Sequence, residues 1–146
     1  MQDTSQMQTT LLLAFVLTGF LQQARDVSQV ASENAAFTKI GAEKSLEARK
    51  QLVSNFEKTY PKSDHLPQVF MDLSRLLVNN TDFVNAKQYA EKAVSTVARM
   101  KTESSDPARQ QWLSSLDTST KSNLAWVQQM MAWRDRQLRS TVLGKR

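Results

Sequence analysis

The sequence predicts an all-α protein, and three observations lead to this fold class. Only three glycines and three prolines interrupt the 146 residues. Ala, Leu, Gln and Lys, which favour helices, are among the dominant residue types. Apolar side chains recur at three- and four-residue spacing, which places them on one face of a helix. The length suits a single domain with a hydrophobic core, so we expect residues 1–146 to form one unit.

The first predicted element is the apolar segment LLLAFVLTGFL at residues 11–21. It has about half the length that a membrane-spanning helix needs, so no membrane span is expected. The ten residues before it carry an Asp and no Lys or Arg, which argues against a secretory signal peptide here. We expect residues 1–33 to form an apolar N-terminal helix, covered by the rest of the chain or by a second copy. Leu13 and Leu17 are its candidate self-association residues, and a homodimer is one alternative.

The next elements are amphipathic helices. Apolar residues on a helical rhythm predict one long helix over residues 34–60, which ends at Tyr60 because Pro61 follows. A second helix begins near Pro67 and ends near Asn79, and a third is capped by Asp82 and runs to about residue 101. The second and third are joined by about three residues. They are therefore expected to pack as an antiparallel hairpin.

The C-terminal part begins with the polar residues 102–106, and Asp106-Pro107 suits the cap and first turn of another helix. Apolar residues then recur at helical spacing from Trp112 to Leu138. The run DTSTK at residues 117–121 is poor in helix formers, so the pattern allows either one helix or two. Along the chain we expect an apolar helix at 1–33, a helical core at 34–101 and capping helices at 102–146.

Between Phe70 and Ala93 the chain reads FMDLSRLLVNNTDFVNAKQYAEKA. This segment resembles a tetratricopeptide repeat (TPR) without a gap. Large side chains stand at the positions where the family has large residues, and Ser74, Ala86 and Ala93 stand at its small positions. Thr81-Asp82-Phe83 occupies the turn where the family usually has Gly-Asp-Tyr. Ala90 departs from the pattern because it replaces a usual aromatic. The resemblance implies antiparallel helical hairpins stacked as a short right-handed superhelix, with long flanking helices.

The phrase FEKTYPKS at residues 56–63 also resembles the link between repeats in bacterial envelope TPR proteins. Together the two segments extend the resemblance over roughly residues 45–100. The opening Gln-Asp-Thr-Ser after Met1 is similar to a mature end left by signal removal. The resemblance therefore implies a bacterial periplasmic or envelope location in preference to the cytoplasm.

Candidate catalytic and metal-binding groups are absent from the sequence. There is no cysteine, and the one histidine, His65, is expected in a loop without nitrogen partners for a metal. The carboxylates are expected at caps or on polar faces, and no phosphate-binding loop or nucleophile motif occurs. The net charge of +5 comes with no nucleic-acid reading motif, so we interpret the basic C-terminal residues as a solvated tail. We expect a non-enzymatic protein without cofactors.

The resemblance implies a protein- or peptide-binding scaffold of unknown partner, in which the first helix of each hairpin lines a concave groove. It places four residues there: Gln68, Met71, Arg75 and Asn79. The alternative is a structural or oligomerisation module that self-associates through the N-terminal helix or through Trp126 and Trp133. These two tryptophans and Trp112 are spaced by multiples of seven. We expect all three to pack in the core, with a ligand surface or a coiled-coil seam as the alternatives.

Overall fold

The computed structural model describes residues 26–143, and the chain divides into two compact units, Met1–Ala36 and Phe37–Arg146. In the described part of the first unit, residues 26–36 are helical. The second unit holds the end of that helix and four further helices, and no strand occurs in the part described. The all-α prediction is confirmed. Leu13 and Leu17 lie outside the described residues.

The helix predicted over residues 34–60 is in fact interrupted at residues 43–45. One helix covers residues 26–42, and α2 spans Leu46–Thr59. Ser45 caps α2 by accepting from the Ala48 N–H at 3.4 Å. The Arg49 guanidinium turns back to donate to the carbonyls of Gly41, at 3.2 Å, and Glu43. The prediction of one helix was wrong because these side chains satisfy the backbone groups of a break that periodicity alone does not reveal.

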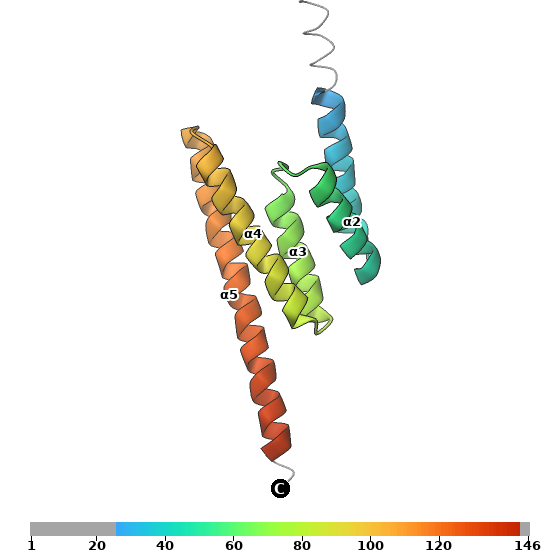
Figure 1. Cartoon of the computed structure of the whole chain (residues 1–146), viewed down its shortest axis with the longest axis vertical. Helices are drawn as coiled ribbons and strands as arrows, with labels where there is room; N and C mark the ends of the chain where they lie inside the picture. Colours follow the sequence, from blue (N-terminus) through green and yellow to red (C-terminus); the bar gives the residue numbers. More distant parts are fainter. Residues whose placement is uncertain (1–25, 144–146) are drawn as a thin grey trace, which may run out of the picture. The chain divides into compact units, whose positions relative to one another are not determined.

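Helices α3 (Leu66–Asn79) and α4 (Phe83–Glu103) form the expected antiparallel hairpin, with residues 80–82 between them (Figure 1). Pro67 lies in the first turn of α3. Asp82 caps α4 by accepting from the Asn85 N–H at 3.3 Å and from Asn85 Nδ2 at 2.7 Å. The sequence signals for this hairpin therefore act as predicted.

The C-terminal part is one helix, α5, which spans the 37 residues Pro107–Leu143. Residues 117–121 continue it without a break. Within this polar run the hydroxyls donate to carbonyls of the preceding turn, as Thr118 does to Ser114 at 3.2 Å. Lys121 Nζ lies 2.9 Å from Asp117 Oδ2, an ion pair one turn apart. Local bonds and burial of Thr120 thus hold a segment of low helix propensity in the helical state.

In the second unit, each helix from α2 to α5 packs on the next helix in the sequence. Helix α2 packs on α3, α3 on α4 and α4 on α5, and α3 also contacts α5. Four fully buried residues of α4, spaced three or four apart, face its neighbours: Ala86, Ala90, Ala93 and Val97. On α5 a buried stripe repeats every seven residues at Leu113, Thr120 and Val127. Beyond this stripe α5 continues past the α3–α4 turn (Figure 1).

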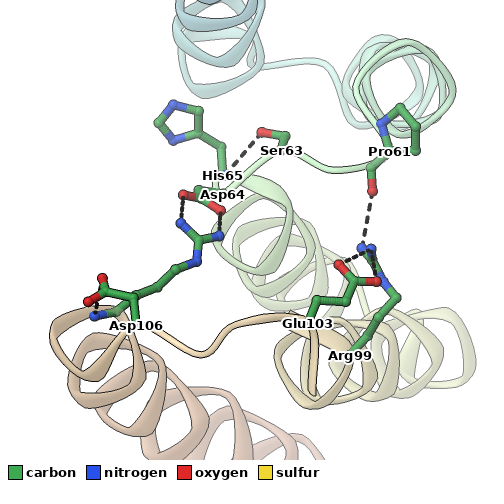
Figure 2. A network of polar contacts seen from close by, with 8 residues as sticks. Pro61, Ser63, Asp64, His65, Arg99, Glu103 and Asp106 are labelled. Carbon is green, nitrogen blue, oxygen red and sulfur yellow. Dashed lines mark hydrogen bonds and ion pairs between the residues drawn. The ribbon is translucent and has the colours of Figure 1, made fainter. Parts of the chain in front are cut away.

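A polar network fastens the α2–α3 loop to the α4–α5 loop (Figure 2). Asp64 accepts two hydrogen bonds from the Arg109 guanidinium, at 2.6 and 2.9 Å. Arg99 pairs with Glu103 and donates to the Pro61 carbonyl at 3.1 Å. The Asp64–Arg109 and Pro61–Arg99 contacts join residues that are far apart in the sequence. They therefore fix the position of the start of α3 relative to the end of α4 and the start of α5.

The histidine lies just before α3, as expected of a loop residue. The ring of His65 stacks on Phe37 with centroids 4.2 Å apart. The backbone N–H of His65 donates to Ser63 Oγ at 3.1 Å (Figure 2). Among the helices of residues 26–143, none is both long and apolar enough to cross a bilayer.

Candidate functional site

Two buried polar residues join α3 to α5. Ser74, with no exposed surface, donates from Oγ to the Met71 carbonyl at 2.8 Å. Asn123 of α5 is almost fully buried and donates from Nδ2 to Ser74 Oγ, also at 2.8 Å. The small Ser74 side chain allows the close approach of the two helices, and the hydrogen bonds satisfy groups that are costly to bury alone. This pair sets the register of α3 against α5.

Arg75, the neighbour of Ser74, is held at the rim of the same junction. Its Nε donates to Asn123 Oδ1 at 3.0 Å. Its Nη1 lies 3.7 Å from Asp72 Oδ1, while the side chain stays about half exposed. Asp72 Oδ1 also accepts from Gln68 Nε2 at 2.8 Å. The guanidinium is therefore oriented by a buried amide while its terminal nitrogens reach solvent.

Beside this junction lies a groove of about 580 Å³ between α3 and α5. This volume is in the range of sites that accept small ligands or a few side chains of a partner. The lining comes from both helices: Arg75, Asn79, Thr118, Ser119, Ser122, Asn123 and Trp126. The α5 members are brought here because Asn123, on their side of the helix, donates to Ser74 of α3.

The four predicted groove residues divide into two pairs. Arg75 and Asn79 line the groove. Gln68 is half-buried and bonded to Asp72, outside the lining. Met71 is only 3% exposed and belongs to the core, so it presents no surface to a ligand. The TPR resemblance implied that all four line the groove, but the side chain of Met71 is covered by packing.

The α5 half of the groove was not predicted. Thr118, Ser119 and Ser122 lie in or next to the polar run at 117–121, where the sequence left open whether the helix continues. Small polar residues carry no distinctive chemical signal. The buried positions Leu113, Thr120 and Val127 repeat every seven residues across the polar run, and this pattern indicates an unbroken helix.

The tryptophans lie at the surface, and the prediction that they pack in the core was wrong. Trp112, Trp126 and Trp133 are 43%, 37% and 51% exposed. Trp112 and Trp126 immediately precede the buried positions Leu113 and Val127, and Trp133 precedes position 134, where the seven-residue repeat continues. Each tryptophan therefore lies at the edge of the stripe. Trp126 lines the groove, and Trp133 is two helical turns further along α5.

The groove is lined by hydrogen-bonding groups, one positive charge and an aromatic ring. Its lining offers one guanidinium, two amides, three hydroxyls and an indole, with no imidazole or carboxylate beside the hydroxyls. A hydroxyl nucleophile needs such a base nearby. In the part of the chain that the structure describes, no group of three or more potential ligands could hold a metal ion. Shape, hydrogen bonding and the charge of Arg75 are what the groove provides.

A second hollow, of about 420 Å³, lies by the α4–α5 loop and includes Lys62, Arg99 and Arg109. Arg99 and Arg109 are engaged by Glu103, Pro61 and Asp64. Asp64 raises the pKa of Arg109, chiefly through their hydrogen bond. This hollow is part of the loop fastening, and the α3–α5 groove is the better site for a ligand. Compared with protein families, curated proteins and solved structures, the chain gives no match.

Proposed function

We propose that the chain is a non-enzymatic, TPR-like scaffold that binds another protein through the groove between α3 and α5. The observation that carries this proposal is the groove itself, with an oriented guanidinium at one wall and a partly exposed indole at the other. Arginine and tryptophan are the residue types that most often dominate the free energy of protein association.

The packing order supports the TPR part of the proposal. In a repeat of this kind, the first helix of one hairpin packs on its own second helix and on the first helix of the next hairpin. Helix α3 packs on α4 and also contacts α5, as this scheme requires. The lining comes from α3 and α5, with no residue of α4. The two first helices would thus form the concave side.

Site-specific photo-crosslinking tests the proposal. A photoreactive phenylalanine analogue at Ser122, inside the groove, should crosslink a discrete partner in cells of the source organism. The matched control carries the analogue at Gln128, an exposed position about half a turn around α5 from the groove. Crosslinks of equal yield at both positions, or none at Ser122, would count against the groove.

A substitution pair tests the same surface independently. Arg75→Glu combined with Asn79→Ala should abolish the Ser122 crosslink, because it reverses the charge and shortens one wall. Asn79 is exposed, but Arg75 also donates to Oδ1 of the buried Asn123, so the melting temperature should fall somewhat, and circular dichroism must show that the variant is folded when the crosslink is measured. An undiminished crosslink in the double variant would contradict the proposal.

The second candidate is an oligomerisation module. The specific observation in its favour is the end of α5, where Trp133 and Leu138 are 51% and 53% exposed. Light scattering at micromolar concentration separates the two functions. A dimer that Trp133→Asp dissociates would favour self-association, whereas a monomer would rule this face out as a stable homodimer contact.

A further inference from the structure

The exposed side of α5 carries a regular aromatic ridge. Trp126 and Trp133 are seven residues apart, and Ser119 stands one repeat earlier in the groove. At a rise of about 1.5 Å per residue, the two tryptophans are about 10.5 Å apart along the helix. A partner that covers both must therefore present apolar groups at this distance.

A helix matches this spacing most closely, whereas a β-strand does not match it. Residues i and i+7 of a partner helix lie on one face with the same spacing as the two tryptophans. In a strand, three residues span about 10 Å, but the side chains at i and i+3 point to opposite faces. The ridge therefore fits a helix laid along α5, with one apolar residue beside each tryptophan.

The charges that flank the ridge are mainly basic. Arg75 borders the groove on the α3 side, and Arg136 stands three residues after Trp133, on the same side of α5. No carboxylate is among the lining residues, but the nearby Asp72 lies 3.7 Å from Arg75 Nη1 and offsets part of the charge of Arg75. A second copy of this chain would bring its own Arg136 toward these arginines. Like charges in contact disfavour a second copy and favour an acidic occupant.

We propose that the groove and the Trp126–Trp133 ridge together bind an acidic amphipathic helix of another protein. Its apolar residues at i and i+7 lie against the two indoles, and its flanking Asp or Glu residues face Arg75 and Arg136. This proposal rests on the proposed scaffold function and specifies the chemistry of the partner segment.

A displayed library of helical peptides tests the proposal on the full chain. Each peptide carries Leu at i and i+7, and the flanking positions are randomised equally among Glu, Gln and Lys. Selection should enrich Glu over Lys by about tenfold or more, because charge complementarity governs the choice of partner. Selection on the Arg75→Glu, Arg136→Glu double variant should reverse the preference. Lys58→Glu, the same charge reversal at an exposed position of α2, should leave it unchanged.

The outcomes separate this proposal from the function on which it rests. If helical peptides are enriched without a charge preference, or with Lys preferred, the proposal that the partner helix is acidic is contradicted. A Ser122 crosslink would still support the scaffold function in that case. No helical binder at all, with the crosslink present, would overturn the helical partner. A missing crosslink would remove the function itself. A dimer lost on Trp133→Asp would assign the ridge to a second copy and also overturn the proposal.

Discussion

At the scale of single residues, the α3–α4 turn carries a strained backbone. Thr81 has a φ of 62°, in the left-handed region that β-branched residues rarely adopt. It follows Asn80, whose N–H donates back to the end of α3, and it precedes the cap Asp82. This is also the position where the resembled repeat usually has glycine. The substitution therefore has a physical cost that the turn hydrogen bonds offset.

Thr81→Gly should raise the free energy of unfolding by up to about 1 kcal/mol. Glycine removes a conformational strain of about 1–2 kcal/mol and adds about 0.5–1 kcal/mol of unfolded-state entropy. Urea denaturation followed by circular dichroism measures the difference. Thr118→Gly, inside helical α5, is the matched control and should lower stability. A loss of stability in Thr81→Gly would contradict the role of strain.

Asp117 is a second residue whose surroundings predict a measurable effect. A hydrogen bond from Lys121 lowers its pKa below the ordinary value of 3.8, with a further contribution from Lys101 at the end of α4. A lowered folded-state pKa stabilises the native chain above the unfolded-state pKa. The stabilisation is lost as the pH falls through the folded-state value.

Asp117→Asn should therefore destabilise the chain at about pH 7 and have a smaller effect at about pH 3. The measurement is the urea midpoint of both proteins at the two pH values. A deficit of equal size at both would show that the Asp117 charge is not responsible. Asp135→Asn, on the exposed end of α5, serves as the control and should change neither midpoint appreciably.

At the scale of elements, α4 packs through small side chains. Ala86, Ala90 and Ala93 have no exposed surface, so its backbone lies close to its neighbours. The alanine at position 90, where the resembled repeat has an aromatic, is therefore matched to its surroundings. Exchanging it for a larger residue would force the helices apart.

Ala90→Leu should lower the free energy of unfolding by about 1–3 kcal/mol, the usual cost of overpacking a full core. Thermal denaturation gives the comparison. Val84→Leu, on the exposed side of the same helix, should stay within about 0.5 kcal/mol of the parent. Equal melting temperatures for the Ala90 variant and the parent would mean that α4 has room at this position.

At the scale of the whole molecule, all three tryptophans lie at the surface of the second unit. Two of them border the proposed docking surface. The intrinsic tryptophan fluorescence of the chain can therefore be used to observe both the free state and the bound state.

The native chain should fluoresce close to the wavelength of the unfolded chain and should be quenched strongly by acrylamide. Binding of an acidic helical peptide should shift the emission to the blue and reduce quenching, because the indoles near the groove leave water. The single variants Trp126→Phe and Trp133→Phe show how much each of these indoles contributes to the blue shift and to the reduced quenching. Trp112→Phe is the control. Blue-shifted emission in the absence of ligand would indicate that the ridge is already covered.

Much of the fold follows from local signals in the sequence. Pro67 and Asp82 mark the α3–α4 hairpin because their effects on the backbone depend on a few neighbouring residues. The same holds for the all-α class, which rests on composition and periodicity. The TPR resemblance and the function it implies stay predictions, since no comparison or contact tests them.

Tertiary structure decided the rest. The sequence placed Met71 in the groove and the tryptophans in the core, whereas Met71 is buried and the tryptophans are exposed. Periodicity identifies a face of a helix but not what covers it. Asn123 and Ser119 became part of the site because α5 runs unbroken beside α3, held by the buried Ser74–Asn123 hydrogen bond. Contacts between residues 49 positions apart depend on packing, and a local pattern cannot specify them.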